Sequence, residues 1–298
     1  MKASLLDELA RRPLLCDGAM GTQLFAAGLA PGACGEVWNA QNAKAVEAIH
    51  ARYRSAGCDL VTTNTFGGTS IALERHGLAA RADELNRAGA AAARRAVGDG
   101  AWVLGDVGPL GAFLEPLGEV TPEAATEMFA AQVRALRAGG ADAVVVETMS
   151  DATEMAVAVT AARAAGACPV IATYAFGKGD RSEAFRTMMG VGVDAALGAA
   201  VDAGADVVGA NCGISLGLDD YRRLADALVK AARGRWVILQ PNAGSPETVG
   251  GKLVYGATPA AMAEMVPAML ACGVRIVGGC CGTTPEHLAA MAARMVMK

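Results

Sequence analysis

Short apolar runs alternate with longer helical stretches along the chain, and this pair recurs eight times. The apolar runs are nearly continuous, which is typical of parallel strands covered on both faces. The predicted strands span residues 14–21, 59–66, 102–109, 142–149, 169–176, 206–213, 236–244 and 275–282. The predicted helices span residues 44–56, 69–97 (as two helices), 122–139, 151–166, 191–203, 219–232, 258–271 and 285–296.

Eight strand–helix units predict an α/β fold, a single (β/α)8 TIM barrel. Segments such as GGAD (139–142) and AGAD (203–206) each end a helix with glycine and lead into the next strand. No linker or low-complexity segment divides the chain, so we expect one barrel domain over residues 1–298. A doubly wound open sheet is the alternative architecture.

Chemically capable side chains stand at the end of nearly every predicted strand. They are Asp17, Asn64, Asp106, Glu147, Tyr174, Asn211 with Cys212, Asn242, and Cys280 with Cys281. In a barrel these strand ends meet at one rim, where such enzymes place their chemistry. We therefore expect residues from both ends of the sequence to share one pocket.

Composition and charge narrow the classes of partner. The net charge of −4 argues against nucleic acid, whose binding needs clustered basic residues. The longest apolar candidate, residues 155–171, contains Arg163 and Pro169 and predicts no membrane span. The first residues predict a short helix capped by Ser4 and not a signal peptide. Eight cysteines in such a chain favour reduced thiols and a cytoplasmic protein.

Three of the cysteines could bind one metal ion. Cys212 closes the sixth predicted strand, and Cys280 and Cys281 close the eighth. Three thiolates with one open position are typical of a catalytic zinc site. Neighbouring side chains on a regular strand point to opposite faces, so the glycines around the pair are expected to turn both sulfurs the same way.

Other interpretations of the cysteines and histidines remain. A pair of adjacent cysteines can be a packing feature, and Cys16, Cys58, Cys168 and Cys272 are expected to be core residues. A redox pair is disfavoured, because a disulfide between neighbours is strained. The three histidines, His50, His76 and His287, are expected at the surface or in a helix cap, which disfavours a histidine-based hydrolase.

Seven motifs together resemble the homocysteine S-methyltransferase family. They are DGAMGT (17–22), TNTF (63–66), VGP (107–109), ETMSD (147–151), GANCG (209–213), PNAG (241–244) and GGCCGTTPEH (278–287). The resemblance implies a barrel enzyme with one zinc per chain, held by Cys212, Cys280 and Cys281, that methylates homocysteine to methionine. It further implies that Glu147 binds the substrate ammonium and that Asp17 and Gly18 surround its amino-acid end. We expect Asn64, Asn211 and Asn242 to order the loops around metal and substrate, although ordinary turn roles are an alternative.

The methyl donor is a separate question. TMMG (187–190) resembles bacterial betaine–homocysteine methyltransferases, whereas PNAG resembles the homocysteine-binding module of cobalamin-dependent methionine synthase. The chain lacks a D-x-H-x-x-G signature, so we expect it to bind no cobalamin itself. We predict an onium donor, betaine or S-methylmethionine, held by rim aromatics: Trp38, Phe66, Phe113, Tyr174 and Phe185. The alternatives are a separate methyl-corrinoid protein as donor, another thiol or a selenol as acceptor, and a non-catalytic zinc-barrel docking subunit.

Overall fold

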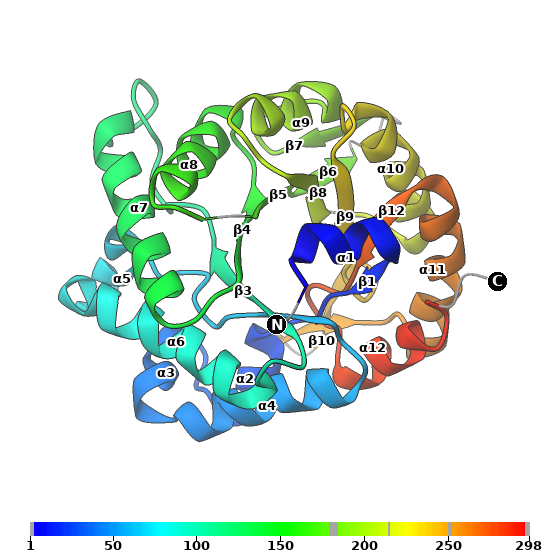
Figure 1. Ribbon diagram of the computed structural model, residues 1–298, viewed down its shortest axis with the longest axis horizontal. Coiled ribbons are helices and arrows are strands. Elements are labelled where there is room, and N and C mark those ends of the chain that lie inside the picture. Colours follow the sequence, from blue (N-terminus) through cyan, green and yellow to red (C-terminus); the bar gives the residue numbers. More distant parts are fainter. Residues whose placement is uncertain (1–2, 168, 179–183, 214, 250–251, 296–298) are drawn as a thin grey trace.

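Eight parallel strands close into a barrel in the computed structural model, which describes residues 3–167, 169–178, 184–213, 215–249 and 252–295 (Figure 1). The strands are β1 (Leu14–Leu15), β2 (Leu60–Thr62), β3 (Trp102–Val107), β4 (Ala143–Met149), β5 (Val170–Tyr174), β8 (Val207–Asn211), β9 (Trp236–Gln240) and β12 (Val274–Val277). Strand β1 pairs with β12, and a bridge between Cys16 and Leu60 joins it to β2. This ring confirms the single α/β domain with a (β/α)8 barrel and rules out the open sheet.

Apart from the first helix, which lies across the amino end of the barrel, the helices surround the barrel on its outside (Figure 1). They are α1 (Leu5–Arg11), α2 (Gly21–Ala26), α3 (Trp38–Gln41), α4 (Ala43–Ser55), α5 (Ser70–Glu74), α6 (Ala82–Val97), α7 (Pro122–Ala138), α8 (Ala152–Ala164), α9 (Val193–Asp202), α10 (Leu218–Ala231), α11 (Pro259–Cys272) and α12 (Pro285–Ala292). Side chains of Thr121, Asp151 and Thr258 accept hydrogen bonds from the first turns of α7, α8 and α11. Each cap satisfies backbone N–H groups that a helix start leaves without partners, which is why the predicted starts agree with the structure.

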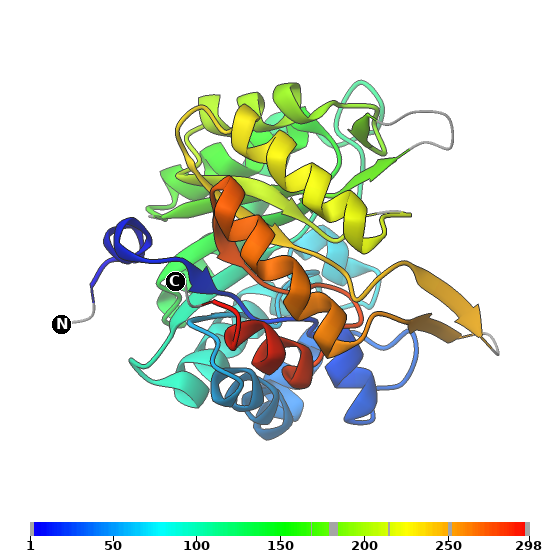
Figure 2. The ribbon, with the colours of Figure 1, turned by 90° about the vertical axis from the view of Figure 1, so that its right-hand side faces the viewer.

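Two antiparallel hairpins extend the loops after β5 and β9, and the sequence pattern missed both. They are formed by β6 (Phe176–Lys178) with β7 (Phe185–Thr187) and by β10 (Pro246–Val249) with β11 (Lys252–Tyr255). Figure 2 shows the second hairpin projecting on the side of the barrel opposite the N-terminus. Both follow the carboxyl ends of barrel strands and therefore stand over the rim where the site was expected.

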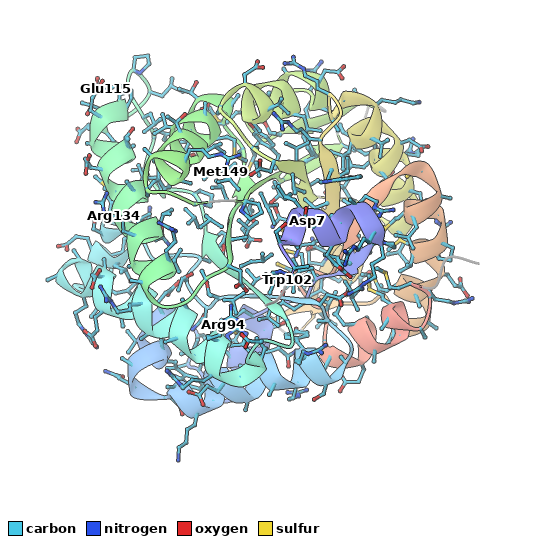
Figure 3. The ribbon with its side chains drawn as sticks, viewed as in Figure 1. Asp7, Arg94, Trp102, Glu115, Arg134 and Met149 are labelled. Atoms are coloured by element: carbon cyan, nitrogen blue, oxygen red, sulfur yellow. The ribbon has the colours of Figure 1, made fainter. Side chains whose placement is uncertain are left out.

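The interior of the barrel changes from apolar to polar along the strands. At the amino end, α1 lies across the ring, and its Leu5 and Leu9 pack with the inward-facing side chains (Figures 1 and 3). This interior cluster comprises Leu5, Leu9, Leu14, Cys16, Leu60, Trp102, Leu104, Ala143, Val145, Ile171, Val207, Ile238 and Ile276. Alternate residues of a strand share a face, so the next inward positions after Leu104 and Val145 are Asp106 and Glu147.

The structure corrects one histidine prediction. His50 in α4 is completely buried, and neither ring nitrogen has a hydrogen-bond partner among the described residues, so the predicted surface or capping role is wrong. Burial lowers its pKa to about 4 and keeps the ring neutral. His287 does cap α12, through its Nδ1 and Thr284.

The other expectations from composition have mixed outcomes. Cys16 and Cys58 are buried as predicted, Cys272 is half-buried, and Cys168 lies outside the described residues. Ser4 caps α1. Within the described ranges, none of the helices combines the length and the apolar character needed to cross a membrane.

Candidate metal and substrate site

Three sulfur atoms converge at the carboxyl end of the barrel. Cys212 directly follows β8, and Cys280 and Cys281 lie in the loop after β12. Their Sγ atoms all lie within 4.8 Å of one another, and those of Cys212 and Cys281 are 4.0 Å apart. Tetrahedral coordination with Zn–S bonds of about 2.3 Å places two sulfurs about 3.8 Å apart. The Cys212 and Cys281 sulfurs are therefore close to this spacing, and the three half-buried thiols lie near enough together to hold one metal ion.

The backbone around these cysteines is unusual. Cys212 itself has a φ of 55°, a conformation that residues other than glycine seldom adopt. Gly282 has a φ of 78°, and a Cβ there would lie 2.2 Å from the ring of Tyr255. A Cβ on Gly279 would lie 2.5 Å from Oγ1 of Thr283. The glycines beside the cysteine pair thus permit a turn after the pair and close packing before it.

Asn242 joins the two loops that carry the cysteines. Its Oδ1 accepts from the backbone N–H of Cys281 at 3.0 Å, and its Nδ2 donates to the carbonyl of Gly213 at 3.2 Å. The hydroxyl of Tyr221, from α10, donates to the carbonyl of Cys212 at 2.6 Å. These bonds to the backbone order the two loops that carry the cysteines, as expected of Asn242.

Asn211 links the cysteine cluster to Glu147. Its Nδ2 lies 3.2 Å from Oε2 of Glu147, 2.7 Å from Oγ1 of Thr148 and 3.9 Å from Sγ of Cys280. Its Oδ1 accepts from the N–H of Thr148 and the hydroxyl of Thr173, both at 2.8 Å. The amide therefore sets the position of Glu147 relative to the sulfurs.

The three thiols influence one another's ionisation. Hydrogen bonds from Cys280 and Cys281 lower the pKa of Cys212. The same contact with Cys212 raises the pKa of Cys280 and of Cys281. One thiolate is thus stabilised by its neighbours, and a second or third requires a cation among them. This donor set fits a soft divalent ion such as zinc.

Buried carboxylates gather in the polar part of the barrel interior. Burial raises the pKa of Glu147 to about 8, with smaller contributions from the charges of Asp17 and Cys212. Burial also raises the pKa of Asp17 to about 7, against the hydrogen bonds from Thr62 that lower it. The pKa of Asp106 is raised well above its usual range, again chiefly by burial. This part of the barrel would be stabilised by a positively charged ligand.

Asp17 and Gly18 lie where the chain leaves β1. Both carboxylate oxygens of Asp17 accept bonds from Thr62, from its N–H at 2.8 Å and its hydroxyl at 2.9 Å. A Cβ on Gly18 would lie 2.4 Å from Oγ1 of Thr283, in the loop of the cysteine pair. A larger residue at position 18 would therefore collide with this loop. The Asp17 side chain, in turn, already has hydrogen-bond partners within the protein.

Asn64 differs from the other two asparagines. Its Nδ2 donates to the carbonyl of Gly35 at 2.8 Å and to Oδ1 of Asn39 at 2.9 Å. It therefore orders the loop after β1, and no bond joins it to the cysteines or Glu147 among the described contacts.

The five rim aromatics do not form one cage. Tyr174 is fully buried and Phe185 nearly so, with the guanidinium carbon of Arg223 5.9 Å from the centroid of the Phe185 ring. Trp38 packs against the core, whereas Phe66 and Phe113 are 42% and 61% exposed. The aromatic residues predicted to hold an onium group thus lie in different environments and do not surround one common site.

A profile of the homocysteine S-methyltransferase family matches residues 14–295. The chain belongs to this family. The resemblance predicted from the motifs is therefore confirmed.

Curated relatives of this family member include methionine synthases. Those of Mycobacterium leprae and Mycobacterium tuberculosis are 34% and 35% identical over 302 and 308 residues. Each alignment covers 97% of this chain and 25% of the relative, so the chain spans about a quarter of the length of these proteins.

Solved structures support the fold. The metallated form of the homocysteine methyltransferase MmuM from Escherichia coli superposes with a TM-score of 0.76, at 23% identity over 97% of this chain and 98% of that chain. Its apo form gives a TM-score of 0.72 at 23% identity and 98% coverage of both chains. At this identity the likeness concerns the barrel alone.

Thr148, Tyr221 and Tyr255 contribute to the site and were missed by sequence reasoning. Thr148 has a φ of 60° and bonds both polar atoms of the Asn211 amide. Tyr221 lies within a helix and Tyr255 at the end of a hairpin strand, so neither stands at a predicted strand end. Only the folding of these elements over the rim brings them to the cysteines.

Proposed function

We propose that this chain is a zinc-dependent S-methyltransferase that converts homocysteine to methionine. The observation that carries the proposal is the convergence of the Cys212, Cys280 and Cys281 sulfurs within 4.8 Å. Support comes from the membership of the homocysteine S-methyltransferase family and from Glu147 in the adjoining layer.

The chemistry requires a deprotonated substrate thiol. A free alkyl thiol has a pKa of about 8.5 and is mostly protonated at neutral pH. A zinc ion held by the three cysteines would lower the pKa of the substrate thiol, so that its proton would be released to solvent. The thiolate then forms a bond to the methyl carbon as the bond between that carbon and the donor breaks.

Residues of the chain position the substrate for this attack. Glu147 would bind the ammonium, and its bond to Asn211 fixes the distance between the ammonium site and the sulfur site. The amide of Asn211 also lies 3.9 Å from Sγ of Cys280 and would maintain the orientation of that ligand. The raised pKa of Glu147 falls when an ammonium pairs with it, so substrate binding favours the carboxylate form.

The test is methionine formation by the zinc-loaded chain. Glu147→Gln should raise the KM for homocysteine by about tenfold to a hundredfold, because a charged hydrogen bond is lost. Glu154→Gln is the matched control, since Glu154 accepts from the N–H of Leu110 at 2.6 Å and has no contact with the cysteines among its described bonds. An unchanged KM in Glu147→Gln would contradict the assignment of the ammonium.

The donor has two candidates. The sequence predicts an onium compound, betaine or S-methylmethionine. The five aromatic residues expected to hold it do not surround one site, so the structure adds little support for this donor. The large apolar side chains that are exposed in the described residues all lie in segments that follow the carboxyl ends of strands. They are Phe25, Phe66, Phe113, Leu117, Met188, Met189 and Val254. Exposed apolar groups collected at one end are typical of a protein contact, which favours a methyl-corrinoid protein as donor.

A donor panel distinguishes these candidates. The zinc-loaded protein and homocysteine are incubated with betaine, S-methylmethionine, methylcobalamin or a methyl-corrinoid protein, and methionine is measured. Turnover with an onium compound supports the sequence prediction, and turnover with the corrinoid alone supports the alternative. A chain that binds the corrinoid protein and turns over none of the donors would be a docking subunit.

A further inference from the structure

Asp106 is held firmly by its backbone, while Oδ1 of its carboxylate has no hydrogen-bond partner in the part of the chain that the structure describes. Its N–H donates to Oγ1 of Thr63 at 2.9 Å, and its carbonyl accepts from the hydroxyl of Thr65 at 2.8 Å. The residue is only 4% exposed, and Oδ1 has no hydrogen-bond partner among the described residues. A buried polar atom without a partner is unfavourable, so a ligand is the natural donor to this oxygen.

The position of Asp106 directs its side chain into the barrel, one inward step beyond the apolar interior cluster. It lies two residues beyond Leu104, which belongs to the interior cluster, and therefore shares the inward face of β3. Glu147 lies two residues beyond Val145 on the neighbouring strand β4, also on the inward face. The register of β3 and β4 places Asp106 opposite Val145, so Glu147 is the next inward residue towards the carboxyl end and lies diagonal to Asp106 on the adjacent strand.

The charges that act on Asp106 are all negative. Besides burial, its pKa is raised by Glu147, Glu36 and Asp17, in that order. Asp17 already accepts two bonds from Thr62, and Glu36 accepts from the N–H of Gly67 at 2.7 Å. Asp17 and Glu36 thus already accept hydrogen bonds from protein groups, whereas Oδ1 of Asp106 can still accept one from a ligand.

We propose that Asp106 is a further substrate-binding residue, which receives the α-ammonium of the amino-acid thiol together with Glu147. An ammonium has three N–H donors, which need several acceptors. Glu147 offers fewer of these, because its Oε2 already accepts a hydrogen bond from Asn211. A second buried acceptor makes the site selective for aminothiols over thiols that lack the amine. This inference rests on the proposed function.

The experiment compares two acceptors and two variants. Homocysteine and 4-mercaptobutanoate, which differ by the amino group alone, are titrated calorimetrically into zinc-loaded wild type, Asp106→Asn and the control Glu154→Gln. Asp106→Asn should weaken homocysteine binding by about tenfold to a hundredfold and leave 4-mercaptobutanoate binding unchanged. Its KM for homocysteine should rise in parallel with little change in kcat.

Equal weakening for both thiols, or none for homocysteine, would overturn the proposal. If wild type binds homocysteine but forms no methionine with any donor, the proposed function fails while the calorimetric comparison still decides the role of Asp106. Should Asp106→Asn fail to fold, a crystal structure of wild type with homocysteine takes its place. The substrate nitrogen within hydrogen-bond distance of Oδ1 supports the proposal, and a nitrogen beyond it refutes it.

Discussion

The two ends of the barrel are built from the same strands and have opposite character. At the amino end, Leu5 and Leu9 of α1 pack with Trp102 in a buried apolar cluster. At the carboxyl end, the inward positions carry acids, amides and thiols. Asp106 lies two positions beyond Leu104, and Glu147 lies two positions beyond Val145. The comparison teaches that each strand can supply core at one end and chemistry at the other.

Backbone strain follows the same division. Among the described residues, four non-glycine residues have positive φ, and three of them, Thr148, Cys212 and Ser215, follow or end strands at the carboxyl side. Each such conformation costs on the order of 1–3 kcal/mol. The stability of the apolar end thus offsets the cost of these strained residues at the polar end, and the chain stays folded.

The largest expected effect is loss of the metal at the carboxyl end. The double variant Cys280→Ala, Cys281→Ala should lose zinc and all methyl transfer, since only one of three ligands remains. Zinc content by atomic emission and methionine formation are the measurements. Cys272→Ala is the control, because this half-buried cysteine lies outside the cluster. Full zinc occupancy in the double variant would refute the ligand assignment.

The amino end should respond in the opposite way. Leu9→Ala leaves a cavity under α1 and should lower the free energy of unfolding by about 2–5 kcal/mol. Zinc content and the KM for homocysteine should stay as in wild type. Denaturant unfolding and metal analysis check both parts, and a loss of zinc in the folded variant would show that the two ends are coupled.

A smaller effect concerns pH at the carboxyl end. The pKa of Asp17 is about 7 in the folded chain and near 3.8 ordinarily, so between these values only the native state keeps the proton. The stability that this group contributes therefore falls as the pH rises from about 4 to 7 and is level above 7. Relative to Asp17→Asn, wild type should lose less than about 4 kcal/mol over this range. A pH-independent difference between the two unfolding curves would contradict the raised pKa.

The smallest effect on stability is expected at the exposed rim. Phe113→Ser, at a side chain that is 61% exposed, should change the free energy of unfolding by about 0.5 kcal/mol or less. If the rim contacts a methyl-corrinoid protein, transfer from that protein should slow while transfer from free methylcobalamin stays the same. Equal rates with the protein donor before and after the change would remove Phe113 from the contact.

The sequence by itself determined the order of strands and helices, because apolar runs and caps such as Thr121 act on residues close by in the chain. It also determined which residues could bind a metal, since Cys212 and the cysteine pair stand at strand ends. Barrel closure decided what those residues meet: only the approach of β8 and β12 to their neighbours brings the sulfurs within 4.8 Å. The Asp17 carboxylate turns to Thr62 across the seam of the barrel, and hairpin residues such as Tyr255 fold over the cysteines. These contacts join segments far apart in the chain, so no local pattern of hydrophobic and polar positions can encode them.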